Sequence, residues 1–192
     1  MTIKTFNINT DKTAFVRAYL PDSIAGLPFC EKRPAVLIFP GGGYEYCSDR
    51  EGEPIALQYL ALGYAAFVVT YSCNERFPEP LMDAAYIFYK IRMRAEEFKI
   101  DPQKMAVLGC SAGGHLAGCL ATMWSDIALT KTIGCEPEDL RPNAAILCYP
   151  VISGVTAPHE GSFKVLLGED ASRSDLSRLS LENRVTPKTP PV

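Results

Sequence analysis

Short apolar runs alternate with longer amphipathic segments along the middle of the chain. Four of the runs are continuous, as in strands that are buried on both faces of a sheet. They are residues 35–39 (AVLIF), 64–70 (YAAFVVT), 105–109 (MAVLG) and 144–149 (AAILCY). Residues 14–20 alternate only weakly, which predicts an early edge strand.

Predicted helices fill the intervals between these strands. Residues 54–62 begin with Pro54 and are followed by Gly63, residues 80–98 carry apolar side chains at helical spacing, and residues 111–123 are apolar and small. The second of these segments has a predicted polar face made of Lys90, Arg92, Arg94, Glu96 and Glu97. Strands that alternate with helices predict right-handed crossovers and a mainly parallel sheet with helices on both faces, which is an α/β fold.

The alternation fades after Val151, and residues 151–186 predict a lid-like or irregular excursion. This region is rich in Ser, Pro and charged residues and holds one short apolar stretch, residues 163–167. With 192 residues, 47% of them hydrophobic, the chain is expected to form a single domain with a substantial core.

Composition and charge exclude several classes of protein. The net charge is only −3 without a block of like charge, so the basic footprint of a nucleic-acid-binding protein is missing. The longest apolar run, residues 59–69, is about half the roughly 20 residues that a membrane-spanning helix needs. The N-terminus is too polar for a signal peptide.

Cysteine usage predicts the compartment. The seven cysteines form no CxxC motif and no Cys/His cluster at zinc spacing. We therefore expect a reduced, cytoplasmic protein that needs neither a metal nor an organic cofactor. The sequence leaves the oligomeric state open, a homo-oligomer included.

Residues 109–113 (GCSAG) form a GxSxG motif at the junction of a predicted strand and a predicted helix. In this context Ser111 stands at a sharp turn with its hydroxyl exposed. The helix N-terminus then offers a backbone N–H and a positive dipole end to a developing oxyanion. A side chain at either flanking glycine would collide with the neighbouring strand or helix. The alternative is a glycine-rich turn that only packs tightly.

A second glycine-rich segment, residues 40–44 (PGGGY), follows the first of the four buried strands. Such a loop can bring backbone N–H groups close to a substrate. A phosphate-binding loop would place Lys and Ser or Thr after the glycines, whereas Tyr44-Glu45-Tyr46 stands here. A purely structural turn also stays open. Together the two motifs would supply donors from both sides of one point, as acyl transfer requires.

These motifs resemble the α/β-hydrolase superfamily, in its branch of small bacterial carboxylesterases and carbohydrate acetyl esterases related to the hormone-sensitive-lipase group. The matching segments are 40–44 (PGGGY), 70–72 (TYS), 100–118 (IDPQKMAVLGCSAGGHLAG), 149–153 (YPVIS) and 180–192 (SLENRVTPKTPPV). The resemblance implies a serine hydrolase of short acyl esters, such as acetylated sugars or xylan fragments, that acts through an acyl-enzyme on Ser111.

The resemblance also assigns roles to other residues. The backbone N–H groups of Gly42, Gly43 and Ala112 correspond to the family's oxyanion hole. Tyr44 and Tyr46 are candidates for lining the substrate pocket.

A serine nucleophile needs a histidine base that a carboxylate orients, and the chain contains only two histidines. We expect His115, one turn after Ser111, to be buried in helix packing. His159 lies in the excursion and is a weak candidate base. In the family the acid and the histidine follow the seventh and eighth strands. The resemblance therefore implies a chain truncated before its last two strands.

Two further hypotheses stay open. The chain could be a catalytically incomplete fragment without activity of its own, or a non-catalytic member of the superfamily that binds a small molecule. Either way the predicted partner is a small molecule, an ester in the leading hypothesis, with no nucleic acid and no membrane. A serine-reactive fluorophosphonate separates these hypotheses, because only a working base permits labelling of Ser111.

Overall fold

A computed structural model describes residues 1–7, 14–23 and 32–192 of the chain. These residues form a six-stranded sheet with the strand order β1-β2-β4-β3-β5-β6. The strands are β1 (Thr2–Asn7), β2 (Phe15–Leu20), β3 (Arg33–Phe39), β4 (Ala65–Thr70), β5 (Ile100–Cys110) and β6 (Ala144–Cys148). The pairs β1–β2 and β2–β4 are antiparallel, and the pairs that join β4, β3, β5 and β6 are parallel. The sheet is thus mixed, with the predicted parallel core.

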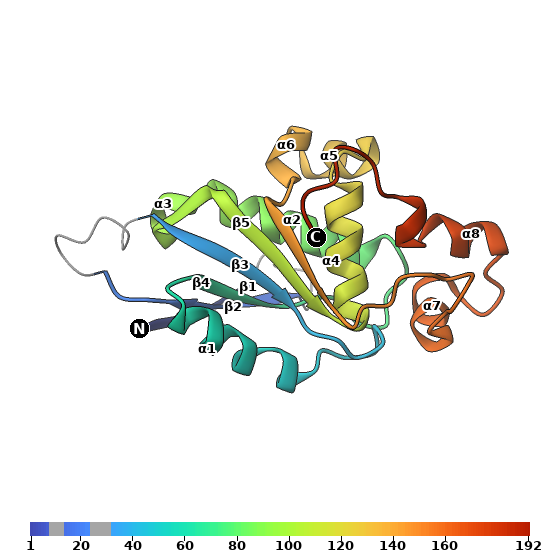
Figure 1. The fold of residues 1–192 in the computed structure, drawn as a ribbon, viewed down its shortest axis with the longest axis horizontal. Coiled ribbons are helices and arrows are strands. Elements are labelled where there is room, and N and C mark those ends of the chain that lie inside the picture. Colours follow the sequence, from blue (N-terminus) through green and yellow to red (C-terminus); the bar gives the residue numbers. More distant parts are fainter. Residues whose placement is uncertain (8–13, 24–31) are drawn as a thin grey trace.

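Helices cover both faces of the sheet (Figure 1). Helix α1 (Glu53–Ala61) lies on one face, and α2 (Glu79–Met93) and α4 (Ala112–Met123) lie on the other. Alternation along β3 explains this arrangement: Leu37 and Phe39 belong to the core beneath α2 and α4, whereas Val36 and Ile38 pack beneath α1. Because both faces of β3 are buried, residues 35–39 are continuously apolar, and the prediction of a doubly covered strand is confirmed.

The predicted edge strand is wrong in its position. β2 has a neighbour on each side, because residues 2–7 form β1 and pair with it from Thr2 opposite Leu20 to Asn7 opposite Phe15. Most residues of β1 are exposed, so the strand carries no buried stripe that the sequence could reveal.

The helix predicted over residues 80–98 is also corrected. It ends at Met93, and the short helix α3 (Ala95–Phe98) follows after Arg94. Arg92 lies on the buried side of α2, not on the predicted polar face, and only 8% of it is exposed. The reason lies in α6 (Pro137–Leu140), which follows α5 (Ile127–Ile133): the Arg92 guanidinium donates hydrogen bonds to carbonyl groups at the end of α6.

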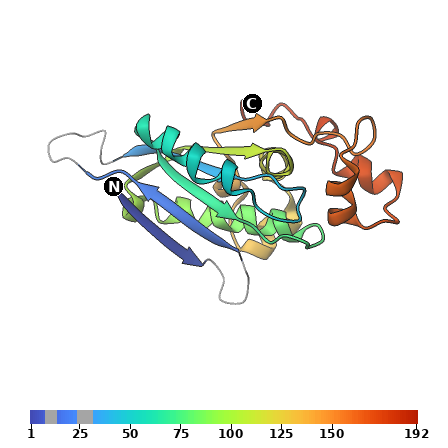
Figure 2. The same ribbon diagram turned by 90° about the horizontal axis from the view of Figure 1, so that it is seen from below.

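Residues 151–186, the predicted excursion, contain α7 (Glu160–Leu167), α8 (Arg173–Arg178) and the 3-10 helix η3 (Leu181–Asn183). Helices α7 and α8 lie beyond the carboxyl ends of the parallel strands (Figure 2). The chain then returns to the core, where the Leu181 N–H donates to the Ile152 carbonyl at 3.0 Å. At the edge strand β6, the Ala145 N–H donates to the carbonyl of Pro191 at 2.9 Å.

Candidate active site

Ser111 occupies the turn between β5 and α4 in a strained backbone conformation. Its φ is 52° and its ψ is −118°, a region that residues with a side chain rarely adopt. Three backbone hydrogen bonds hold the turn. The Ser111 N–H donates to Cys148 at 3.0 Å, and the Ser111 carbonyl accepts from Val151 and from His115, each at 3.1 Å. Strain that the surroundings maintain in this way is typical of functional sites.

The two glycines that flank Ser111 permit close backbone packing, as the sequence predicts. A Cβ on Gly109 would lie 2.0 Å from the Gly113 carbonyl oxygen, and a Cβ on Gly113 would lie 2.0 Å from the Phe39 carbonyl oxygen. Both distances are far inside van der Waals contact. The two glycines therefore let β5, the helix α4 and the end of β3 meet at the serine.

The glycine-rich loop after β3 lies beside Ser111. A Cβ on Gly41 would be 3.0 Å from the Cβ of Ser111. The loop turns through positive φ values at Gly42 (131°), Gly43 (67°) and Tyr44 (67°). Within the described residues, the N–H groups of Gly42 and Gly43 donate no hydrogen bond to the protein. They are therefore available as donors to a bound group.

A cavity of about 370 Å³ opens between this loop and the turn at Ser111. Its lining residues are Gly42, Gly43, Glu45, Tyr46, Ser48, Arg50, Glu51, Ser111, Tyr149, His159 and Gly161. The structure thus brings together Ser111, two of the three predicted oxyanion residues, Tyr46 and His159. The third, Ala112, is the buried first residue of α4 and directly follows the serine.

Tyr44, predicted beside the pocket, lies elsewhere. It is buried in the core, and its hydroxyl lies 2.7 Å from Nδ1 of His115. Tyr46 is 58% exposed and borders the cavity. The two tyrosines point in different directions because the chain reverses between them, where the Tyr46 N–H bonds back to the Gly42 carbonyl.

Glu51 is a site residue that the sequence did not indicate. One oxygen of its carboxylate accepts from the Gly41 N–H at 2.6 Å, and the other accepts from the Tyr149 hydroxyl at 2.8 Å. Hydrogen bonds to Cys110 and to this carboxylate raise the pKa of Tyr149, which keeps the hydroxyl protonated as a donor. Glu51 thereby connects the glycine-rich loop to the end of β6. No motif marks such a link, because it joins distant parts of the sequence.

His115 is a core residue, as predicted. Its Nε2 lies 2.8 Å from the carbonyl oxygen of Leu179, and its Nδ1 faces Tyr44, so both ring nitrogens are engaged. Complete burial lowers the pKa of His115, because the charged form loses its hydration. The neutral ring therefore joins α4 to the returning segment that precedes η3.

His159 is the N-cap residue of α7, at the cavity wall. Its Nδ1 accepts from the Ser162 backbone N–H at 3.3 Å and lies 2.9 Å from the Ser162 hydroxyl. A neutral ring that accepts at Nδ1 carries its proton on Nε2. Nδ1 is therefore used for helix capping, and within the described residues no carboxylate bonds to it.

The sequence predicts neither a metal cofactor nor a membrane-spanning helix. Among the described residues, no group of three or more His, Cys, Asp or Glu side chains is placed to hold a metal ion. In the same part of the chain, no helix has both the length and the apolar character to cross a membrane.

Comparisons with known proteins identify related sequences. The BD-FAE family model matches residues 27–176. The chain is 31% identical to an acetylxylan esterase of Xylanibacter ruminicola, over 98% of this chain and 36% of that protein. It is 36% identical to endo-1,4-beta-xylanase B of Butyrivibrio fibrisolvens, over 83% of this chain and 26% of that protein. The chain thus spans 36% of the length of the first relative and 26% of the length of the second.

Solved structures share the fold. An acetyl ester-xyloside bifunctional hydrolase from Caldicellulosiruptor lactoaceticus aligns with a TM-score of 0.81 and 35% identity, over 97% of this chain and 66% of that chain. The carboxylesterase Cest-2923 from Lactobacillus plantarum aligns with a TM-score of 0.81 and 26% identity, over 100% of this chain and 70% of that chain. The chain therefore belongs to the BD-FAE family, within the esterase branch of the α/β-hydrolase superfamily.

Proposed function

We propose that this chain carries the nucleophile of a serine ester hydrolase that removes acetyl groups from sugars. The observation that supports this most strongly is the strained turn at Ser111, which faces a cavity shared with Gly42 and Gly43. A serine in this backbone conformation, with unoccupied N–H groups beside it, is suited to nucleophilic attack on an ester carbonyl.

In the proposed reaction, Ser111 Oγ attacks the carbonyl carbon while a base takes the hydroxyl proton. The carbonyl electrons move to oxygen, and the N–H groups of Gly42, Gly43 and Ala112 donate to that oxyanion. When the intermediate collapses, the sugar leaves as an alcohol that takes the proton from the base. Water then attacks the acetyl-serine and releases acetate.

The relatives favour acetylated sugars as substrates. An acetylxylan esterase and an acetyl ester-xyloside bifunctional hydrolase are both similar to the chain. The charged side chains Glu45, Arg50 and Glu51 line the cavity and offer hydrogen-bond partners to a polyhydroxylated leaving group. A cavity of about 370 Å³ is near the lower end for small-molecule sites, which favours short acyl groups.

The proposed function also requires a base. Both nitrogens of His115 are engaged in the core, and Nδ1 of His159 caps α7. A base for serine instead needs one free nitrogen toward Oγ and a carboxylate on the other. We therefore propose that the base is a residue outside the segment 1–192.

The test is acetate release from acetylated xylo-oligosaccharides by the protein isolated from its natural source. The proposal expects turnover, and it expects Ser111→Ala to reduce kcat by at least about 10⁴-fold. His159→Ala should retain most of the turnover. A comparable loss in His159→Ala would instead make His159 the base.

Failure to release acetate, despite saturable binding of the oligosaccharide, would favour the non-catalytic binding protein. Failure of both binding and turnover would favour an incomplete fragment.

A further inference from the structure

Two cysteines meet where the glycine-rich loop contacts the segment that follows β4. Sγ of Cys47 lies 3.8 Å from Sγ of Cys73, and both are free, half-buried thiols. A disulfide needs a sulfur separation of about 2.05 Å, so the two atoms must approach by about 1.8 Å. Side-chain rotation can supply a movement of this size if the backbones are already held together.

Other contacts do hold these backbones together. The Tyr71 hydroxyl donates to the Pro40 carbonyl at 2.7 Å, and the Asn74 backbone N–H donates to the Tyr44 carbonyl at 2.8 Å. The Asn74 side-chain amide donates to the Glu45 carbonyl at 2.9 Å. The hydrogen bonds thus come from residues on both sides of Cys73 and reach residues that precede Cys47, so a covalent bond there would join segments that already touch.

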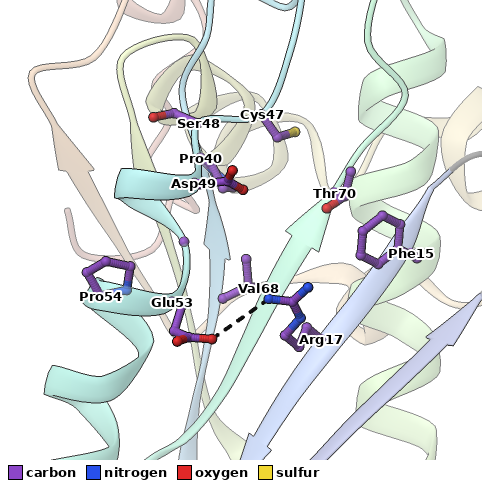
Figure 3. A pocket seen from close by; sticks show the side chains of 11 residues that line it. Phe15, Arg17, Pro40, Cys47, Ser48, Asp49, Glu53, Pro54, Val68 and Thr70 are labelled. Carbon is purple, nitrogen blue, oxygen red and sulfur yellow. Dashed lines mark ion pairs between the residues drawn. The ribbon is translucent and has the colours of Figure 1, made fainter.

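A second cavity borders one thiol of the pair, Cys47, and the other thiol, Cys73, is itself partly exposed. The cavity has a volume of about 620 Å³ and lies between the start of α1 and strands β2 and β4. Figure 3 shows Cys47 at the boundary of this cavity, near Ser48 and Thr70. Ser48 also lines the Ser111 cavity, so Cys47 lies between two residues, Tyr46 and Ser48, that border the candidate active site.

We propose that Cys47 and Cys73 are an oxidative modification site, at which a peroxide forms a disulfide that ties the glycine-rich loop to the segment after β4. The site goes beyond ester hydrolysis and does not depend on it.

The disulfide forms from the two thiols in two steps. The hydrogen bond between the thiols lowers the pKa of Cys73, so its thiolate attacks one oxygen of hydrogen peroxide. The O–O bond breaks, a sulfenic acid forms, and the leaving hydroxide becomes water with the proton lost from Cys73. The Cys47 sulfur then attacks the sulfenic sulfur, and the displaced hydroxide leaves as water with the proton of Cys47. In sum, two thiols are oxidised and one peroxide is reduced to two waters.

The test counts thiols and maps the crosslink in the folded protein. After mild treatment with hydrogen peroxide, free thiols are alkylated and the protein is digested with trypsin without reduction. Cys47 lies in the tryptic peptide 33–50 and Cys73 in the peptide 51–76, so their disulfide gives one crosslinked species. We expect this species, the loss of two alkylatable thiols per chain, and reversal of both by dithiothreitol.

Variants supply the controls. Cys47→Ser and Cys73→Ser should each abolish the crosslink, whereas Cys135→Ser, which changes a half-buried cysteine outside the pair, should retain it. The oxidised wild-type protein should melt about 5 °C or more above the reduced protein, and neither pair variant should show this shift. The proposal is overturned if both thiols stay alkylatable, if the crosslinks join other cysteines or two molecules, or if Cys73 is oxidised further without a crosslink.

Discussion

At the residue scale, the backbone conformation of Ser111 depends on glycines, which have no side chain, at the flanking positions 109 and 113. The turn has room only because Gly109 and Gly113 carry no side chain where β5, α4 and the end of β3 converge. The same close approach places the serine against Gly41 of the glycine-rich loop. Small changes at these glycines therefore test the architecture of the site directly.

We expect Gly113→Ala to lower the free energy of unfolding by about 3 kcal/mol, because the new Cβ meets the backbone carbonyl of Phe39 at 2.0 Å and neither can move easily. Gly134→Ala is the matched control. Gly134 has a φ of +76° but open space around the position of a Cβ, so only the backbone cost of about 1 kcal/mol applies. Urea unfolding measures both, and equal losses in the two variants would contradict the close-packed turn.

Substitution of Glu51 tests whether its carboxylate connects the glycine-rich loop to the end of β6. Glu51→Ala removes the acceptor of the Gly41 N–H and of the Tyr149 hydroxyl, so we expect a loss of about 1–2 kcal/mol in unfolding free energy. The rate of acetate release should fall by about tenfold or more if the link positions the glycine-rich loop. Glu51→Gln keeps one acceptor oxygen, so its unfolding free energy and its rate of acetate release should lie between those of the wild type and of Glu51→Ala.

Glu45→Ala serves as the control for Glu51, because Glu45 lines the same cavity but, within the described residues, its side chain makes no hydrogen bond. If Glu45→Ala changes the free energy of unfolding by more than about 0.5 kcal/mol, the effect of Glu51→Ala would reflect loss of a negative charge and not loss of its hydrogen bonds.

His115 makes stability depend on pH. Burial lowers its pKa in the folded state, so below the unfolded pKa of about 6.5 the unfolded chain binds the extra proton. The stabilising contribution is therefore complete above about pH 6.5 and is lost as the pH falls, by up to about 1.4 kcal/mol per pH unit. The free energy of unfolding should fall more between pH 7.5 and pH 5.5 in the wild type than in His115→Asn. Parallel pH profiles would rule this out.

At the element scale, α2 shows why a correct helix prediction can place a side chain wrongly. The spacing of apolar residues reveals the side of the helix that faces the sheet, but not the contact with α6 on its flank. Arg92 spans that contact and donates to the carbonyls of Glu138, Asp139 and Arg141 at 2.8–2.9 Å. Burial lowers its pKa to about 10, and the guanidinium remains charged at neutral pH.

Arg92→Ala should therefore cost about 3 kcal/mol, because the carbonyl groups at the end of α6 lose a buried, charged donor. Arg92→Lys should recover only part of the loss, since an ammonium group cannot reproduce the planar fork. Arg94→Ala is the control: its ion pair with Glu97 is exposed and should contribute less than about 1 kcal/mol. Thermal unfolding in which Arg94→Ala costs more than Arg92→Ala would contradict this account.

At the scale of the whole molecule, the sequence predicts what repeats or lies in a compact motif. The four continuous apolar runs become β3 to β6, and the GxSxG motif lies at the turn where β5 meets α4. By contrast, β1 is an exposed strand without an apolar stripe. Glu51 acts through partners at Gly41 and Tyr149, one of them 98 residues away, and only the folded chain brings them together.

If Ser111 is an activated nucleophile, a serine-reactive probe should label it covalently. The protein isolated from its natural source would be treated with a fluorophosphonate and digested with trypsin, which places Ser111 in peptide 105–131. We expect a phosphonate adduct on Ser111 in the folded protein, with no adduct in Ser111→Ala or after unfolding. A folded protein whose Ser111 stays unmodified, or which is labelled equally in the Ser111→Ala variant, would contradict this expectation.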